Sequence, residues 1–437
     1  MNIRVRFVAL SCLLLLGSAD LQAQDLSFSP YSRYAIGDIF HPTTTRNAAM
    51  GGIGVASDNY FSINRLNPAS YADIVFTTMD VSAFGQYDRI STRTQTATPF
   101  HAGLHDAAFA FPSNKGPVIT FGFAPYSSVG YSLISRRDIQ LDTTYVEENR
   151  YLGEGGLNQA FLGAAFRMWK NRLRLGINVQ YIFGNTQYRW DNGIFRIVGD
   201  TTVLSPDHQA VSVLRDVYVR GANGQTGFIY QDTIKASKRI LWRIGGMVEY
   251  SIGVSGDRYT TFNNGLVGDT LGSQESGTIA LPLKYGGGFM INRPGYWSFG
   301  ADITYQDWAT FTYFSDSLTL GPELRVAVGG EWTPEPDAFK YFKRINYRFG
   351  AYYKQSYIQF GDQPVVDYGI TMGIGLPAGA QGNSRLNPGR ATSRISLSLE
   401  LGRRGNLKQE LPLEELYARI RLGFAINDRW FVRRVVD

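Results

Sequence analysis

The sequence is poor in the residues that supply most catalytic and metal-binding chemistry. It has one cysteine, Cys12, which lies in the leader described below, so the mature chain has no thiol for a disulfide or a thiolate metal site. His101 and His105 have i, i+4 spacing, but we expect them in a loop before a strand, and no carboxylate takes the zincin position. A G-x-S-x-G nucleophile motif is also missing. We therefore predict no metal, no cofactor and no enzymatic activity.

A dominant charge and a membrane-spanning apolar run are missing as well. The chain has 43 Lys and Arg against 37 Asp and Glu, and the basic residues are scattered, which argues against a nucleic-acid partner. The apolar run at 7–16 is too short to span a membrane. Because Arg4 and Arg6 precede it and Ala23 ends a Leu-Gln-Ala triplet, residues 1–23 are expected to be a cleaved secretory signal peptide.

Glycine and aromatic residues, by contrast, are abundant. The 48 glycines, 26 tyrosines and 27 phenylalanines favour many short strands joined by tight turns. Within 173–183 every odd position is apolar and the even ones are mostly polar or small, and the same alternation recurs in 297–306 and 368–376. Because successive side chains of a strand point to opposite faces, these segments are expected to be amphipathic strands.

Two architectures share this alternation. A soluble sandwich buries the apolar face, whereas a transmembrane barrel turns it towards lipid and keeps the small, polar face in the lumen. The segments are about ten residues long, the length of a tilted membrane strand. Trp297, Trp308, Trp332 and Trp430 lie near strand ends, where aromatic girdles form in barrels. The sequence therefore predicts an all-β fold, a transmembrane antiparallel β-barrel.

The number of strands follows from the alternating segments. About thirteen lie between Thr77 and Ile426, and closed single-chain barrels have an even number, so we expect about 14. The last strand would be 416–426, with its even-numbered residues facing outward. The region 194–235 is ambiguous and reads mainly as a long extracellular loop with some strand character, and 255–277 reads as a long polar loop.

The glycine-rich stretch from Met50 to Ser70 raises the question of phosphate binding. Gly51-Gly52-Ile53-Gly54 is not G-x-G-x-x-G, and no Gly-Lys-Ser/Thr follows it. The preceding residues 43–47 are polar rather than an apolar strand. We therefore exclude a phosphate loop.

Three segments together resemble a known family. They are RNAAMGGIGVASDNYFSINRLNPAS (46–70), LPLKYGGGFMINRPGYWSFGADITYQDWATF (281–311) and ELRVAVGGEWTPEP (323–336). With the hairpin motif Asp307-Trp308-x-x-Phe311, they resemble the FadL/TodX family of outer-membrane transporters for long-chain fatty acids and other hydrophobic compounds. The aromatic opening FSPYSRYAIGDIF and the ending VRRVVD depart from the family pattern and are similar to divergent Bacteroidetes-type members.

The resemblance implies a division of the chain and a mechanism. Residues 24–70 would form a hatch in the lumen, 71–431 the barrel and 432–437 a short tail. An apolar ligand would enter from the extracellular side, and hatch movement with a strand kink would release it sideways into the bilayer. The implied hatch and gating residues are Gly51, Gly52, Gly54, Asn67, Pro68 and Ala69. Gly122 and Pro125 are candidates for the kink, the alternative being an ordinary hairpin turn.

Two functions follow from this interpretation. The first is passive uptake of hydrophobic small molecules such as fatty acids or hydrocarbons across the outer membrane, whose lipid surrounds the barrel. The alternative is a non-transporting subunit or scaffold of a multiprotein outer-membrane assembly or secretion complex, with other envelope proteins as partners. The strand pattern is the same in both, so the sequence leaves the choice open.

Overall fold

A computed structural model describes residues 26–57, 60–113, 116–139, 145–198, 201–204, 210–264, 269–314, 316, 318–378, 393–407 and 411–428. The expected cleavage after Ala23, Trp430 and the tail 432–437 lie outside the described residues. What is said below of the fold and its contacts concerns the described ranges.

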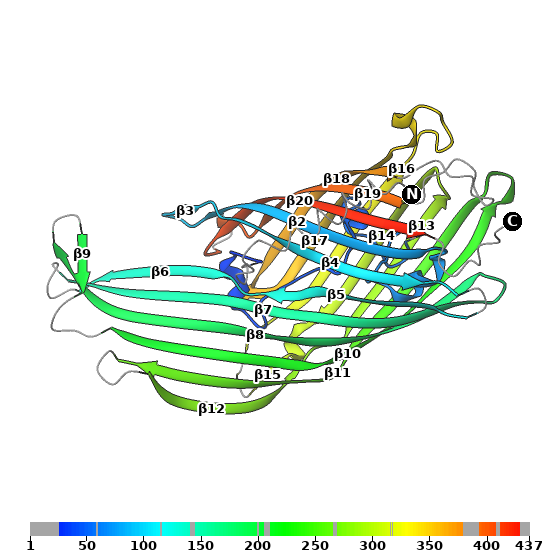
Figure 1. Cartoon of the computed structure of the whole chain (residues 1–437). Coiled ribbons are helices and arrows are strands. Elements are labelled where there is room, and N and C mark those ends of the chain that lie inside the picture. Colours follow the sequence, from blue (N-terminus) through cyan, green and yellow to red (C-terminus); the bar gives the residue numbers. More distant parts are fainter. Residues whose placement is uncertain are drawn as a thin grey trace, which may run out of the picture.

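Fourteen antiparallel strands close into a barrel (Figure 1). Each wall strand pairs with the next, and β20 pairs with β2 to close the ring. The wall strands are β2 (Thr77–Ser91), β4 (Phe100–Phe111), β5 (Val118–Ser128), β7 (Tyr145–Met168), β8 (Leu173–Val198), β10 (Val211–Lys235), β11 (Ile240–Asn263), β13 (Lys284–Arg293), β14 (Trp297–Asp307), β16 (Pro322–Trp332), β17 (Asn346–Phe360), β18 (Gln363–Ala378), β19 (Ser393–Arg404) and β20 (Glu414–Asp428).

Shorter elements lie at the two ends of the wall. Five short strands lie at the end of the barrel opposite Thr77 and Asp428. They are β3 (Thr96–Ala97), β6 (Tyr131–Asp138), β9 (Thr201–Leu204), β12 (Asp269–Ala280) and β15 (Thr312–Tyr313). The 3-10 turns η3 (Ala236–Lys238) and η5 (Tyr341–Arg344) lie at the other end. Because short turns mark the periplasmic end of such barrels, the end at which β2 begins and β20 ends corresponds to the periplasmic one. No helix in the described ranges has the length and apolar composition needed to cross a membrane.

The alternation predicted from the sequence is confirmed in β8. Ile177, Val179 and Tyr181 point outward and are at least half exposed, whereas Arg174 and Asn178 point into the barrel and are buried. The even-numbered residues of β20 from Leu416 onward also face outward, as expected. An apolar outer face and a polar inner face are the reverse of a soluble protein, and they match a barrel surrounded by lipid.

The two long loops expected from the sequence are instead strands. Residues 211–235 form β10, paired with β8 and β11, and 255–277 belong mainly to the β11–β12 hairpin. Four wall strands therefore reach 24–26 residues rather than about ten. At about 3.3 Å per residue, such a strand is far longer than the ~25 Å apolar band of a barrel. Beyond the membrane both faces meet water, so apolar alternation is lost while backbone pairing continues.

Two local expectations were also wrong. His101 and His105 lie within β4, not in a loop, and both rings are buried on its inner face. Trp308 belongs to the 3-10 turn η4 (Trp308–Thr310) and is 1% exposed, so it is not part of a lipid-facing girdle. Trp332, by contrast, is 50% exposed on the outer face.

The chain before β2 lies inside the barrel, and we call its described residues from 26 to 76 the N-terminal segment. Its elements are η1 (Pro30–Arg33), β1 (Asp38–Ile39), α2 (Thr45–Ala48) and η2 (Pro68–Asp73). The Thr44 hydroxyl caps α2 by accepting from Asn47 N, and Asn67 caps η2 with proline at its first position. These N-caps accept from backbone N–H groups at the start of very short helical turns, groups that would otherwise be buried without a partner.

Candidate functional site: the N-terminal segment against the barrel wall

Inward-facing glycines of the wall receive the backbone of the N-terminal segment. A Cβ added to Gly329 would lie 2.2 Å from Met50 O, and one added to Gly350 would lie 2.2 Å from Gly51 N. Other wall glycines whose added Cβ would come within 3 Å of the segment are Gly103, Gly163, Gly176, Gly227, Gly245, Gly288, Gly373 and Gly423. The small face of the strands is therefore the surface on which the segment packs.

The glycines singled out from the sequence lie at the centre of this contact. Gly51 and Gly52 have φ of +68° and +78°, the left-handed region that glycine tolerates best. Gly51 N donates to Thr371 Oγ1 over 2.7 Å. Gly54 N donates to Asp302 Oδ2 over 2.5 Å, and Val55 N donates to the same oxygen over 2.8 Å. One buried carboxylate of β14 thus holds two successive backbone amides.

The Asn67-Pro68-Ala69 triplet ties the segment to another part of the wall. Asn67 Oδ1 accepts from Ala69 N over 3.0 Å, while its Nδ2 donates to Val55 O at 2.7 Å and to Phe228 O at 3.1 Å. All three residues are buried. Asn67 therefore joins two turns of the segment to β10, and Pro68 packs on Gly176 of β8.

Buried ion pairs anchor the segment at its C-terminal end. Asp73, the last residue of η2, binds Arg174 of β8 and Arg243 of β11, and the Asp73 and Arg243 side chains are fully buried. Arg243 Nη1 also donates to Ser57 O over 2.9 Å. A carboxylate between two guanidinium groups satisfies charges that would be costly to bury alone.

Further ion pairs hold α2 and the segment's middle. Arg46 of α2 binds Glu331 of β16 at 3.1 Å, and Arg348 of β17 binds the same carboxylate at 2.7 Å. Arg65 lies 3.7 Å from Asp106 of β4. The anchors therefore reach opposite sides of the wall, so movement of the segment as one body would break several of them at once.

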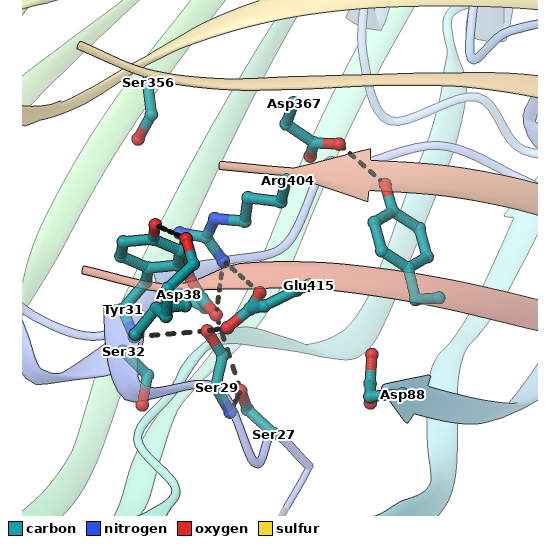
Figure 2. A network of polar contacts seen from close by, with 12 residues as sticks. Ser27, Ser29, Tyr31, Ser32, Asp38, Asp88, Ser356, Asp367, Arg404 and Glu415 are labelled. Carbon is teal, nitrogen blue, oxygen red and sulfur yellow. Dashed lines mark hydrogen bonds and ion pairs between the residues drawn. The ribbon is translucent and has the colours of Figure 1, made fainter. Parts of the chain in front are cut away.

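A polar network anchors the N-terminal end (Figure 2). Arg404 of β19 binds both oxygens of Asp38 in β1, over 2.8 and 2.9 Å, and lies 3.9 Å from Glu415 of β20. Ser29 Oγ donates to Glu415 Oε1 over 2.5 Å, and Tyr31 Oη donates to the carbonyl of Leu413 over 2.8 Å. This bidentate pair fixes β1 on the inner surface.

Burial and these partners shift two pKa values within the segment. Burial alone raises the pKa of Asp73, but Arg243 and Arg174 outweigh it and hold the pKa below its ordinary value. Its contribution to stability is therefore complete above the unfolded pKa and is lost only as the pH falls through the lowered folded pKa. Burial, with Arg325 and Lys284 nearby, holds the pKa of His41 well below its ordinary value, so the ring is neutral at pH 7.

An apolar cluster fills the lumen towards its extracellular end. Trp308 stacks on Tyr357 with ring centroids 4.4 Å apart and lies 5.1 Å from Phe311. Asp307 caps this turn by accepting from Ala309 N over 3.2 Å. The Asp-Trp-x-x-Phe motif therefore brings two aromatic rings into a core that also contains Tyr31, Ile36, Tyr126, Leu157, Ile182 and Val217.

Gly122 and Pro125 lie where β5 separates from β4. The β4–β5 ladder covers only Ala107–Phe111 against Ile119–Phe123, whereas β5 stays paired with β7, with a register shift between Pro125 and Ser127. Strand β1 of the N-terminal segment pairs with β5 just beyond this point, Ile39 opposite Ser127. The place where the wall pairing is incomplete is thus lined from inside by the segment.

A cavity of about 160 Å³ remains between the segment and the wall. Its lining is polar and apolar in equal parts, and its charged residues are Asp38, Asp88, Lys284, Glu323, Arg325, Lys354, Asp367, Glu400, Arg404, Glu415, Arg419 and Arg421. Within the described ranges, no group of three or more His, Cys, Asp or Glu side chains could hold a metal ion. The cavity suits water or a small polar solute better than an apolar molecule.

The anchoring charges were not identified from the sequence as a site. Arg174 and Asp302 stood out only as members of the polar face of alternating segments. A charged residue between two outward apolar neighbours is a usable signal, because in a barrel it must point into the lumen. The pairing of Asp73 with Arg243 joins residues 170 positions apart, and no local pattern contains it.

The model of the BamG family matches this chain over residues 3–437. The chain belongs to the BamG family. No curated protein sequence matches it.

Three solved structures with a similar fold carry titles that name a hydrocarbon channel, a toluene transporter and a FadL homologue. The chain is similar to the CymD monoaromatic hydrocarbon channel (11% identity, TM-score 0.55, 89% of this chain and 98% of that one). It is also similar to the Pseudomonas putida toluene transporter TodX, with 13% identity and a TM-score of 0.55 over 89% of this chain and 98% of that one. A Pseudomonas aeruginosa FadL homologue matches with 12% identity and a TM-score of 0.56 over 90% of this chain and 99% of that one. At such identities the likeness shows the fold alone, so this BamG-family chain shares the barrel fold of these channels.

Proposed function

We propose that this chain is a sealed barrel of the outer membrane that serves as a subunit of a multiprotein outer-membrane assembly and does not transport. The observation that carries the proposal is the filled lumen. The N-terminal segment packs on glycines around the wall, and ion pairs at Asp38, Arg46 and Asp73 anchor it, the last of them fully buried. Releasing the segment would break these pairs together, and breaking a buried pair is costly.

The remaining lumen space supports the same proposal. Pockets for drug-sized ligands measure roughly 300–1,000 Å³ and are mostly apolar. The cavity here is about 160 Å³, and Arg325, Asp38 and Arg404 are among the charges around it. The lumen region rich in apolar side chains is occupied by Trp308, Tyr357 and their neighbours. An apolar molecule would therefore have to displace either packed rings or hydrated charges.

The extracellular sheet offers a surface for partners. Strands β7, β8, β10 and β11 extend well past the others, with β12 beside them (Figure 1). Hydrogen bonds such as Trp190 Nε1 to Asn149 Oδ1 at 3.0 Å and Asn192 Nδ2 to Glu147 Oε1 at 2.9 Å order its polar side chains. A barrel does not need strands of this length to close. The extension outside the membrane is therefore available as a surface for partners.

Passive uptake of hydrophobic molecules is the second candidate function. It is favoured by the short β4–β5 ladder, which leaves the wall incompletely paired beside β1. The fold is also that of proteins described as a toluene transporter and a hydrocarbon channel. Transport would require β1 to separate from β5. An experiment that blocks this separation therefore distinguishes the two candidate functions.

A disulfide between the segment and the wall tests the choice. Ile39 and Ser127 are register partners, so Ile39→Cys with Ser127→Cys should form a disulfide that holds β1 on β5. We expect the oxidised variant to co-purify with the same envelope proteins from mild detergent as the wild type. We also expect fatty-acid and toluene uptake to stay at the background of cells lacking the protein, before and after reduction.

The two single-cysteine variants are the controls, since neither can form the bond. Uptake that is present in the reduced variant and stops on oxidation would overturn the proposal and establish transport. Recovery of the wild-type protein as a lone monomer under every mild extraction would contradict the assembly role.

A further inference from the structure

A groove on the outer face of the barrel lies apart from the lumen. Its volume is about 690 Å³, and it crosses β17, β18, β19, β20 and β2. Strand register places its lining in two successive rungs. The rung nearer the periplasm consists of Tyr87, Ala418, Leu401, Ile370 and Ala351, and the next consists of Arg89, Leu416, Arg403 and Tyr368.

Small side chains make the groove hollow. In the lower rung Ala418 lies between Tyr87 and Leu401, which are 51% and 40% exposed, and Ala351 lies beside Ile370, which is 55% exposed. Each methyl group beside these larger side chains leaves a hollow in the groove that an alkyl chain can fill with favourable dispersion contacts. Its surroundings are lipid-facing, so a flexible acyl chain is the natural occupant.

The two arginines lie at the edge of the apolar band. On β2 the outward residues Met79, Val81, Ala83, Gly85 and Tyr87 carry no charge, and Arg89 is the next one towards the extracellular end. On β19 the outward residues Ile395, Leu397, Leu399 and Leu401 likewise precede Arg403. Both guanidinium groups therefore lie where lipid headgroups begin.

Only one of these two charges is neutralised within the described chain. Arg403 binds Glu414 at 2.7 Å and Asn406 at 3.1 Å, whereas Arg89 makes no ion pair or hydrogen bond to any residue that the structure describes. Two cations and one carboxylate leave a net positive charge beside Leu416. Arginine binds phosphate oxygens through paired N–H donors, and basic residues near a membrane surface attract anionic lipid.

We propose that this groove binds lipid A, the phosphorylated acyl glycolipid of the extracellular leaflet. A lipid A phosphate would lie between Arg89 and Arg403, and two of its acyl chains would lie in the hollows at Ala418 and Ala351. The extracellular position of the arginines favours this lipid over the phospholipids of the periplasmic leaflet. The site is independent of the lumen and of the proposed assembly role.

Native mass spectrometry of the full-length protein in mild detergent tests this proposal, with purified bis-phosphorylated lipid A as the probe. We expect the wild type to retain one lipid A. Arg89→Gln with Arg403→Gln should reduce lipid A affinity about tenfold, since the phosphate loses its charged partners. Ala351→Leu with Ala418→Leu, which fills the two hollows, should reduce it as well. Ala301→Leu is the matched control, because Ala301 faces outward on β14 away from the groove and should leave binding unchanged.

Three results would overturn the proposal. One is equal lipid A retention by the wild type and the double arginine variant, with both shown to be folded by heat-modifiable electrophoresis. Another is equal loss in Ala301→Leu and in the groove-filling variant. The third is retention of phosphatidylethanolamine or phosphatidylglycerol at the same level as lipid A.

Discussion

Asp73 supplies the counter-charge for two buried arginines. Its carboxylate binds Arg174 and Arg243, and its side chain and that of Arg243 have no exposure to solvent. Asp73→Asn keeps the shape but leaves two guanidinium groups without a counter-charge. We expect a loss of about 3–5 kcal/mol in the free energy of unfolding, measured from urea unfolding of the barrel in lipid vesicles.

An exposed pair on the same molecule provides the control. Arg220 and Asp257 lie 3.3 Å apart on the extracellular sheet, where the Arg220 side chain is 69% exposed. Asp257→Asn should change the free energy of unfolding by no more than about 1 kcal/mol, because water screens the pair. Equal losses in the two variants would show that Asp73 is not a buried anchor.

At the scale of elements, the wall strands and the N-terminal segment meet backbone to backbone. A Cβ on Gly350 would lie 2.2 Å from Gly51 N and 2.3 Å from the Met50 carbonyl carbon, and neither atom can move without shifting the segment. We expect Gly350→Ala to cost about 1–3 kcal/mol of unfolding free energy. It should also speed hydrogen exchange of the amides at 46–57.

Gly253 is the matched control for this substitution. It lies in the same kind of strand, but an added Cβ would have nothing within 4 Å. Gly253→Ala should leave the exchange rates at 46–57 unchanged. If it accelerated exchange as much as Gly350→Ala does, close packing of the segment on the wall would not explain the effect.

The strands themselves were predictable only where lipid imposes a pattern. In β8 the alternation from Leu173 to Phe183 identifies both faces, because one meets lipid and the other the lumen. From Val211 to Lys235 no such contrast exists over most of β10, so the sequence indicated a loop where the structure has a strand. Backbone pairing with β8 and β11 holds that segment, and pairing leaves no trace in side-chain periodicity.

At the scale of the molecule, the N-terminal segment occupies the lumen of a ring whose first and last strands pair without it. Strand β2 pairs with β20 over its whole length, so the ring does not depend on residues 26–73. Removing 26–73 should leave a folded barrel whose polar lumen fills with water, and the inward arginines would then be hydrated. We expect this variant to conduct ions in planar bilayers, while the full chain conducts little.

Comparing the conductance of the two proteins requires that the shortened variant folds. Heat-modifiable electrophoresis measures whether it does. A folded variant with no more conductance than the full chain would show that other parts of the protein seal the lumen. Conductance of the full chain at the same level would contradict the sealed barrel directly.

The sequence by itself determined the outer and inner faces of the short strands, the even strand number and the closed barrel. These follow from a local rule, since lipid, lumen and a two-residue repeat act on each strand separately. Only the tertiary structure decided what fills the lumen. Asp73 meets Arg243, and Asp38 meets Arg404, across 170 and 366 residues. Such pairs depend on how distant strands are arranged around the ring, and that arrangement packs a glycine-rich stretch and scattered charges together inside the barrel.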